Sequence, residues 1–226
     1  MENTRQQIIE NILENKLIVI VRGLEKEKML PLAEAMYAGG IRLMEITYAA
    51  DGSVPEETTA ESIRLIRENF AMSVGAGTVL TKRQVELTKA AGGGFIISPN
   101  VCESVIRRTR ELDMVSIPGA MTPTEIQQAH LLGADFVKLF PAAQLGTDYI
   151  KAIRAPLSHI RMLAVGGIDY PDLQSYMKAG ICGFGMGSNI VDKQAIARGD
   201  YAYITELARR FTDATKIRRD ENADHR

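Results

Sequence analysis

The stretch Leu17-Ile18-Val19-Ile20-Val21-Arg22-Gly23-Leu24 opens with the longest uninterrupted apolar run of the 226-residue chain. Its Val and Ile residues favour a β-strand, and five consecutive apolar residues are typical of a strand buried on both faces in a parallel sheet. The turn that follows lacks the Gly-x-Gly-x-x-Gly fingerprint of a dinucleotide-binding sheet. The stretch therefore favours a closed barrel over an open, doubly wound sheet.

The same pattern recurs along the chain, because each apolar run is followed by a segment with helical spacing. Runs about 20 to 30 residues apart match the length of a βα unit. Strands are predicted over Leu17–Val21, Arg42–Ile46, Met72–Gly75, Gly94–Ile97, Val115–Pro118, Phe136–Phe140, Met162–Val165 and Gly183–Gly187. Eight such units predict the α/β fold class, as a (β/α)8 TIM barrel.

The two ends of the chain differ from the repeating units. A helix predicted over residues 4–15 precedes the first strand and is expected to plug the bottom of the barrel. One domain is expected to span residues 1–216. Residues 217–226 are almost all charged or polar, so we expect this tail to fray.

The composition limits the classes of function. The chain is 46% hydrophobic and 24% charged, with a formal net charge of −1, which is ordinary for a soluble globular protein. A near-neutral balance gives no drive toward nucleic acid or an anionic membrane. The longest apolar run is far short of the roughly 20 residues that cross a bilayer. The first five residues do not resemble a secretory signal.

Cysteine and histidine content adds two further expectations. Cys102 and Cys182 are too few for a disulfide scaffold, so a cytoplasmic location is expected. His130, His159 and His225 have no metal-ligand spacing to one another or to a cysteine. The sequence therefore predicts no metal site and no cofactor.

Lys138 is the sharpest chemical signal, since function in a barrel collects at the C-terminal ends of the strands. It lies in Asp135-Phe136-Val137-Lys138-Leu139-Phe140-Pro141, among apolar neighbours. Burial disfavours the ammonium form, which makes a neutral amine available as a nucleophile toward a carbonyl. The alternative is a lysine that only pairs with a carboxylate or extends to solvent.

Glu45 is the second charged residue within an apolar predicted strand, in Leu43-Met44-Glu45-Ile46-Thr47. A carboxylate that points into the barrel can move protons if its pKa rises toward neutrality. The alternative is a structural ion pair with Lys138. The two interpretations are compatible, because a Lys–Glu pair at a barrel mouth is itself a candidate site.

Glycine-rich turns follow three of the predicted strands. Gly166-Gly167 and Gly187-Ser188 follow the seventh and eighth, where barrels often bind phosphate through backbone N–H groups. Thr78 follows the third strand, where its hydroxyl and nearby N–H groups can hold a substrate carboxylate. Each turn by itself could be only a connection between a strand and a helix.

Taken together, these motifs resemble the 2-dehydro-3-deoxy-phosphogluconate (KDPG) and 4-hydroxy-2-oxoglutarate (KHG) aldolases. The resemblance spans Leu17 to about Lys216 and rests on the following segments: Glu-Ile-Thr at 45–47, Gly-Ala-Gly-Thr-Val-Leu at 75–80, Ile-Ser-Pro at 97–99, Val-Lys-Leu-Phe-Pro-Ala at 137–142, Gly-Gly-Ile at 166–168 and Gly-Ser at 187–188. It implies a carbon–carbon lyase that cleaves a 2-keto-4-hydroxy acid to pyruvate and an aldehyde, usually as a homotrimer and without a cofactor.

The resemblance also implies a role for each matching residue. Lys138 matches the lysine that forms the Schiff base, and Glu45 matches the acid/base. Thr78 matches the residue that binds the pyruvate carboxylate. The phosphate loop is matched by Gly166, Gly167, Gly187 and Ser188.

The sequence departs from the family at the second strand. Many members carry an arginine shortly after the threonine of this strand, whereas this chain reads Thr47-Tyr48-Ala49-Ala50-Asp51. Arg22, directly after the first strand, resembles the arrangement in other members and is predicted to hold the carboxylate. The planar guanidinium group of Arg22 suits a carboxylate, because it can donate two parallel hydrogen bonds to the two carboxylate oxygens.

A second departure leaves the substrate open. Val165 stands before Gly166, where gluconate-type members tend to have threonine and galactonate-type members tend to have valine. A 2-dehydro-3-deoxy-6-phosphogalactonate aldolase is therefore an alternative. A phosphate-binding barrel isomerase or synthase and a non-catalytic sugar-acid-binding barrel are further alternatives, in which Lys138 forms no imine.

Overall fold

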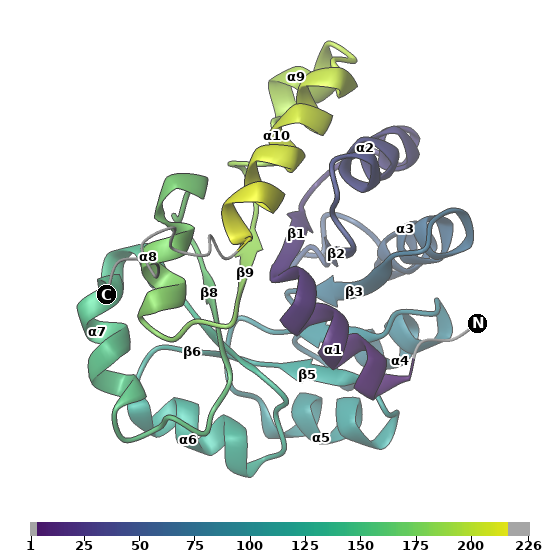
Figure 1. Ribbon diagram of the computed structural model, residues 1–226. Coiled ribbons are helices and arrows are strands. Elements are labelled where there is room, and N and C mark those ends of the chain that lie inside the picture. Colours follow the sequence, from purple (N-terminus) through teal and green to yellow (C-terminus); the bar gives the residue numbers. More distant parts are fainter. Residues whose placement is uncertain (1–3, 217–226) are drawn as a thin grey trace, which may run out of the picture.

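A parallel sheet closes on itself and forms the inner wall of the molecule (Figure 1). The computed structural model describes residues 4–216. The strands follow the order β5-β4-β3-β2-β1-β9-β8-β7-β6. Their bounds are β1 Leu17–Val21, β2 Leu43–Thr47, β3 Ser73–Gly77, β4 Phe95–Ile97, β5 Val115–Ile117, β6 Gly119–Ala120, β7 Val137–Leu139, β8 Met162–Val165 and β9 Gly183–Met186.

Closure of the barrel depends on one passage of the chain. The predicted strand Val115–Pro118 is divided at Pro118 into β5 and β6, because proline has no N–H to donate to a neighbouring strand. Strand β5, before Pro118, pairs with β4, and strand β6, after it, pairs with β7. It therefore joins the two ends of the sheet. The predicted (β/α)8 barrel is confirmed, with its fifth strand in two parts.

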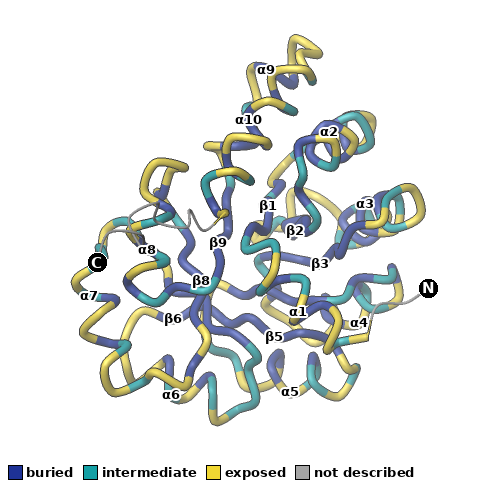
Figure 2. Tube along the Cα trace, viewed as in Figure 1, coloured by how far each residue is buried: buried dark blue, intermediate teal, exposed yellow. Residues whose placement is uncertain are grey.

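Helices cover the outside of the barrel, and burial is concentrated in the strands they surround (Figure 2). The capping boxes at Thr81 and Thr122 place the starts of α4 and α6, since each hydroxyl accepts a hydrogen bond from the backbone three residues later. The helices are α1 Arg5–Asn15, α2 Lys26–Ala38, α3 Glu56–Asn69, α4 Lys82–Ala90, α5 Glu103–Glu111, α6 Pro123–Leu131, α7 Ala142–Arg154, the 3-10 turn η1 Tyr170–Asp172, α8 Leu173–Lys178, α9 Lys193–Ala197 and α10 Tyr201–Thr215.

Helix α1 covers the N-terminal end of the barrel. Its buried residues Ile8, Ile9 and Ile12 belong to the same apolar cluster as the barrel-interior residues Phe95 and Phe136. This packing confirms the extra N-terminal helix and closes the lower end, so the barrel opens at the C-terminal ends of its strands. The tail over residues 217–226 lies outside the described residues, and no helix within 4–216 is long and apolar enough to cross a membrane.

Small residues inside the barrel make room for large ones on neighbouring strands. A Cβ on Gly75 would lie 2.3 Å from the Phe95 ring, and one on Gly185 would lie 2.8 Å from the Val165 side chain. Real Cβ atoms do not approach so closely, so the interior is packed by pairing glycines with bulky side chains. The same arrangement recurs around the charged residues described next.

Candidate active site

Glu45 and Lys138 both point into the barrel near its open end. Side chains alternate along a strand, and these two residues have the same parity as Leu43 and Phe136, which belong to the interior cluster. Glu45 is 2% exposed and Lys138 is 8% exposed. Two ionisable side chains are thus held in a largely apolar interior, where burial of a charged form costs free energy. Buried ionisable groups of this kind cluster at functional sites.

Lys138 is held without a close counter-ion. Among residues 4–216, no carboxylate forms an ion pair with its ammonium group, and Nζ lies 4.9 Å from the centroid of the Phe140 ring. Burial lowers the pKa of Lys138, the Arg22 charge lowers it further, and the Glu45 charge opposes both effects. The lowered pKa increases the fraction of neutral amine, which is the nucleophilic form.

Glu45 lies against backbone in which only glycine fits. A Cβ on Gly77 would be 1.5 Å from the Glu45 Oε1 atom, so a side chain at position 77 would displace the carboxylate. Burial raises the pKa of Glu45 to about 7, although the charges of Lys138 and Arg22 act to lower it. Its Oε2 atom is buried and has no hydrogen-bond partner among residues 4–216. A carboxyl group with a pKa near neutrality can both give and take a proton at physiological pH.

This raised pKa has a consequence for stability. Between pH 4.5 and 7 the Glu45 carboxyl ionises in the unfolded chain and stays protonated in the folded one, so the free energy of unfolding falls as pH rises. Glu45→Gln removes this dependence. We expect the variant to gain about 3 kcal/mol relative to the parent between pH 4 and pH 8, corresponding to a pKa rise from 4.5 to about 7. Urea unfolding at several pH values measures the difference, and a difference that does not vary with pH would contradict it.

Arg22 stands at the mouth of the barrel, directly after β1. It is exposed, and within the described part of the chain it has no ion-pair partner. Its charge nevertheless acts on the pKa values of both Glu45 and Lys138, which places it near the pair. The Thr47 hydroxyl donates a 2.9 Å hydrogen bond to the Val21 carbonyl oxygen and so ties the end of β2 to the residue before Arg22.

Thr78 lines the same large pocket as Arg22. It is a non-glycine residue in the left-handed region, with φ of 54°, a conformation that costs roughly 1–2 kcal/mol and is often retained at functional sites. The hydrogen bonds from Tyr48 N to Gly77 O and from Val79 N to Ile97 O hold the backbone on both sides of it. The structure thus places Arg22 and Thr78 on the lining of one pocket, and their joint role in binding a carboxylate stays a prediction.

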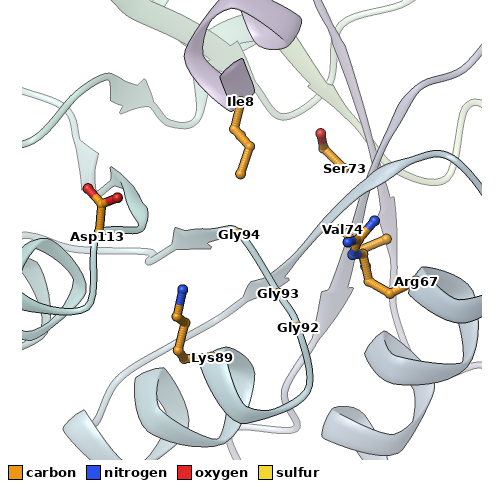
Figure 3. Close-up of a pocket in the computed structure, with 9 residues that line it drawn as sticks. All are labelled: Ile8, Arg67, Ser73, Val74, Lys89, Gly92, Gly93, Gly94 and Asp113. Carbon is orange, nitrogen blue, oxygen red and sulfur yellow. The ribbon is translucent and has the colours of Figure 1, made fainter. Parts of the chain in front are cut away.

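The pocket has a volume of about 640 Å³ and opens at the C-terminal ends of β1, β2 and β3. This size is typical of a site for a small molecule. Arg22 and Thr78 line it, whereas within residues 4–216 neither Glu45 nor Lys138 contributes to its wall. A second, much smaller cavity of about 30 Å³ lies at the other end of the barrel beneath Ile8 (Figure 3). It has room for about one water molecule.

The two glycine-rich turns follow neighbouring, paired strands. Gly166 and Gly167 have φ of 98° and 76°, which glycine adopts readily. The Gly166 carbonyl oxygen accepts a hydrogen bond from Ala143 N, in the first turn of α7. Ser188 is exposed, and a Cβ on Gly187 would meet open space. The four residues predicted to form a phosphate loop therefore lie on adjacent strand ends.

Three structural contributions were not predicted from the sequence. The Phe140 ring lies near Lys138 Nζ and would be 3.0 Å from a Cβ on Gly166, so it connects the lysine to the glycine turn. Gly77 leaves space for the Glu45 carboxylate. Asn189 donates a 2.8 Å hydrogen bond to the Ile168 carbonyl oxygen, which joins the turn after β9 to the turn after β8. The spacing of Phe140, two residues after Lys138, is the sequence signal that places both side chains on the same side of the segment.

Comparisons with known proteins show the family of the chain. The family model described as KDPG and KHG aldolase matches residues 8–207. The chain belongs to this family. It is therefore an aldolase, a carbon–carbon lyase. Within residues 4–216, no group of three or more His, Cys, Asp or Glu side chains is placed to hold a metal ion.

Individual family members resemble the chain over most of its length. It is 32% identical to the 2-dehydro-3-deoxy-phosphogluconate aldolase of Haemophilus influenzae, covering 96% of this chain and 100% of that one. It is 36% identical to the probable 2-dehydro-3-deoxy-6-phosphogalactonate aldolase of Rhizobium meliloti, covering 83% of this chain and 87% of the relative. Both types of aldolase are thus among its relatives.

A solved aldolase structure shows the same fold with a covalently bound ligand. The KDPG aldolase of Legionella pneumophila, with pyruvate captured as a covalent carbinolamine, is 29% identical and has a TM-score of 0.81. The match covers 92% of this chain and 98% of the Legionella chain. A covalent carbinolamine is the species that an amine nucleophile forms with a keto acid.

Proposed function

We propose that the chain is a class I aldolase that cleaves a 2-keto-4-hydroxy acid to pyruvate and an aldehyde, with Lys138 as the Schiff-base lysine. The observation that carries this proposal is the inward-facing pair of Lys138 and Glu45. The amine has a lowered pKa and lacks an ion pair among residues 4–216, and burial raises the pKa of the facing carboxyl group to about 7. The covalent carbinolamine of the Legionella enzyme supports the same chemistry.

The mechanism follows from the two side chains. The neutral Lys138 amine attacks the C2 ketone and forms a carbinolamine. The protonated Glu45 carboxyl gives its proton to the carbinolamine hydroxyl, which leaves as water, and the protonated imine that remains acts as an electron sink. Glu45 accepts the C4 hydroxyl proton as the C3–C4 bond breaks, the aldehyde leaves, and pyruvate remains as an enamine. Glu45 then returns the proton to the enamine carbon, and water releases pyruvate from Lys138. A pKa of about 7 suits Glu45 to both transfers.

The rest of the mouth is proposed to position the substrate. Arg22 and Thr78 hold the carboxylate, since both line one pocket at the C-terminal ends of β1 and β3. A phosphate on the aldehyde half is assigned to the turns after β8 and β9, two strands that lie between β7, which carries Lys138, and β1. These turns are formed by Gly166, Gly167, Gly187 and Ser188.

The substrate is best tested with a panel of 2-keto-4-hydroxy acids in a coupled assay for pyruvate release. The panel contains both C4 epimers of the six-carbon phosphorylated acid, the unphosphorylated acids and 4-hydroxy-2-oxoglutarate. Release from at least one compound supports the proposal. Absence of release from all of them, together with absence of an imine with pyruvate, would favour a phosphate-binding isomerase or synthase in its place.

A galactonate-type enzyme is the second candidate. Val165 is buried and faces the barrel interior, where its side chain packs beside Gly185. This valine matches the residue that galactonate-type members tend to carry before the glycine turn. Preferential cleavage of the galactonate-type C4 epimer would support this candidate, and preference for the gluconate-type epimer would reject it.

The family resemblance also leads us to propose a homotrimer in the cytoplasm. Sedimentation equilibrium of the purified chain tests the trimer, for which a single species of three times the chain mass is expected. Fractionation of the source cells tests the location.

Arg22→Ala is expected to raise KM for every 2-keto acid by a similar factor. Loss of a charge-assisted hydrogen bond costs about 1.5–3 kcal/mol, or roughly one to two powers of ten in KM. The measurement is steady-state kinetics with phosphorylated and unphosphorylated substrates, and Arg107→Ala on the exposed face of α5 is the matched control. An effect confined to phosphorylated substrates would make Arg22 a phosphate ligand and reverse the orientation of the substrate.

A further inference from the structure

The pocket of about 640 Å³ extends beyond the space that a pyruvate carboxylate needs at Arg22 and Thr78. Val21 and Ile46 line it and face outward from β1 and β2, opposite to Glu45. The pocket therefore reaches from the mouth of the barrel into the region between these strands and the first turns of α2 and α3, two helices that lie side by side (Figure 1).

The walls of this outer part are mainly apolar. They include Leu24, Met29 and Val54. Ala49 and Ala50 also line the pocket, in the segment where many family members carry an arginine, and their small side chains leave the space open.

Hydroxyl groups on the same walls are partly engaged already. Ser62 Oγ donates a 3.0 Å hydrogen bond to Thr58 O, and the Tyr48 hydroxyl forms a 3.0 Å hydrogen bond with Thr88 Oγ1. Such a wall suits an apolar group better than a sugar, whose hydroxyls each need a partner.

The charged residues on the pocket lining favour a ligand that carries a single negative group. Lys26 is paired with Glu61 at 2.8 Å, and Asp51 accepts hydrogen bonds from the Ser53 backbone and hydroxyl. Arg22 is the cation on the lining that has no ion pair within the described residues. Glu25, also on the lining, would repel a second anionic group.

We propose that this pocket binds an amphipathic monocarboxylate, with its carboxylate on Arg22 and an apolar tail of about four to six carbons between α2 and α3, a length suited to a pocket of this size. The bound carboxylate would pair with Arg22, the residue assigned to the substrate carboxylate, and the molecule would therefore act as a competitive inhibitor. Only this competition rests on the proposed aldolase function. Binding itself does not, because it can be measured without turnover.

Titration calorimetry with acetate, butanoate and hexanoate tests the tail. Burial of each methylene from water contributes about 0.8 kcal/mol when complete, so affinity should rise by up to roughly tenfold for every two carbons added. Arg22→Gln should weaken binding of all three acids by a similar factor and leave the increase with chain length in place.

Two substitutions locate the tail. Ala49→Phe fills the pocket, and Val54→Glu places a negative charge on its wall. Each substitution should lower the affinity for hexanoate at least tenfold and leave the affinity for acetate nearly unchanged. Ala202→Phe, on the exposed face of α10, is the matched control and should change neither. Because Val54 is 37% exposed, its substitution tests the pocket even if Ala49→Phe does not fold.

Several results of these binding experiments would contradict the proposal. Affinity that does not depend on chain length, or a chain-length effect that survives both pocket variants, would place the tail elsewhere and overturn it. In the active enzyme, hexanoate should raise KM and leave kcat unchanged; binding that leaves KM unchanged would overturn the placement on Arg22. Failure of the aldolase proposal would instead appear as absent pyruvate release with calorimetric binding intact.

Discussion

Lys138→Arg is expected to lower turnover by roughly 10³-fold or more, since loss of a catalytic nucleophile costs as much as about 10⁶-fold in kcat. A guanidinium remains protonated and cannot add to a ketone, although it keeps the positive charge. The position is 8% exposed and close to the Phe140 ring, so thermal unfolding must show that the variant folds. Lys151→Arg on the exposed face of α7 is the matched control and should retain full turnover.

Covalent trapping tests the same residue directly. Pyruvate and borohydride should add one pyruvate-derived adduct to the parent, and peptide mass spectrometry should place it on Lys138. The variant should take up no adduct. An adduct on another lysine of the parent, or an active variant at position 138, would exclude Lys138 as the Schiff-base residue.

Glu45→Gln is expected to slow proton exchange at the pyruvate methyl group by roughly 10²-fold or more, the scale of a positioned acid/base. The amide cannot accept a proton, although it has nearly the shape of the carboxyl group and fits against Gly77. Imine formation with pyruvate should remain possible, so borohydride should still trap Lys138 in the variant.

Deuterium incorporation into pyruvate, followed by NMR, measures the exchange. Glu206→Gln on the exposed face of α10 is the control for loss of one carboxylate. Exchange at the parental rate in Glu45→Gln would leave Glu45 with a structural role, and the proton would have to come from another group or from water. The size of the loss thus separates a catalytic carboxyl from one that only pairs with Lys138.

Much of the fold follows from local features of the sequence. Continuous apolar runs predict strands covered on both faces, and the capping boxes at Thr81 and Thr122 place the starts of helices, because both depend on residues that are near one another in the chain. The predicted strand ends lie within one or two residues of the observed ones. The predicted fifth strand contains Pro118, and its division into β5 and β6 depends on pairing with two different neighbouring strands.

The sequence by itself also selected Lys138 and Glu45, since a charged residue inside an apolar strand is unusual wherever the strand lies. Only the tertiary structure decided how they act. The pKa of Glu45 near 7, the contact of its carboxylate with Gly77 and the place of Phe140 beside Lys138 all join residues from different strands or turns. Burial and charge–charge effects depend on distances in space, and the closure of the barrel sets those distances. The pocket between α2 and α3 has the same origin, because packing of separate helices against β1 and β2 forms it.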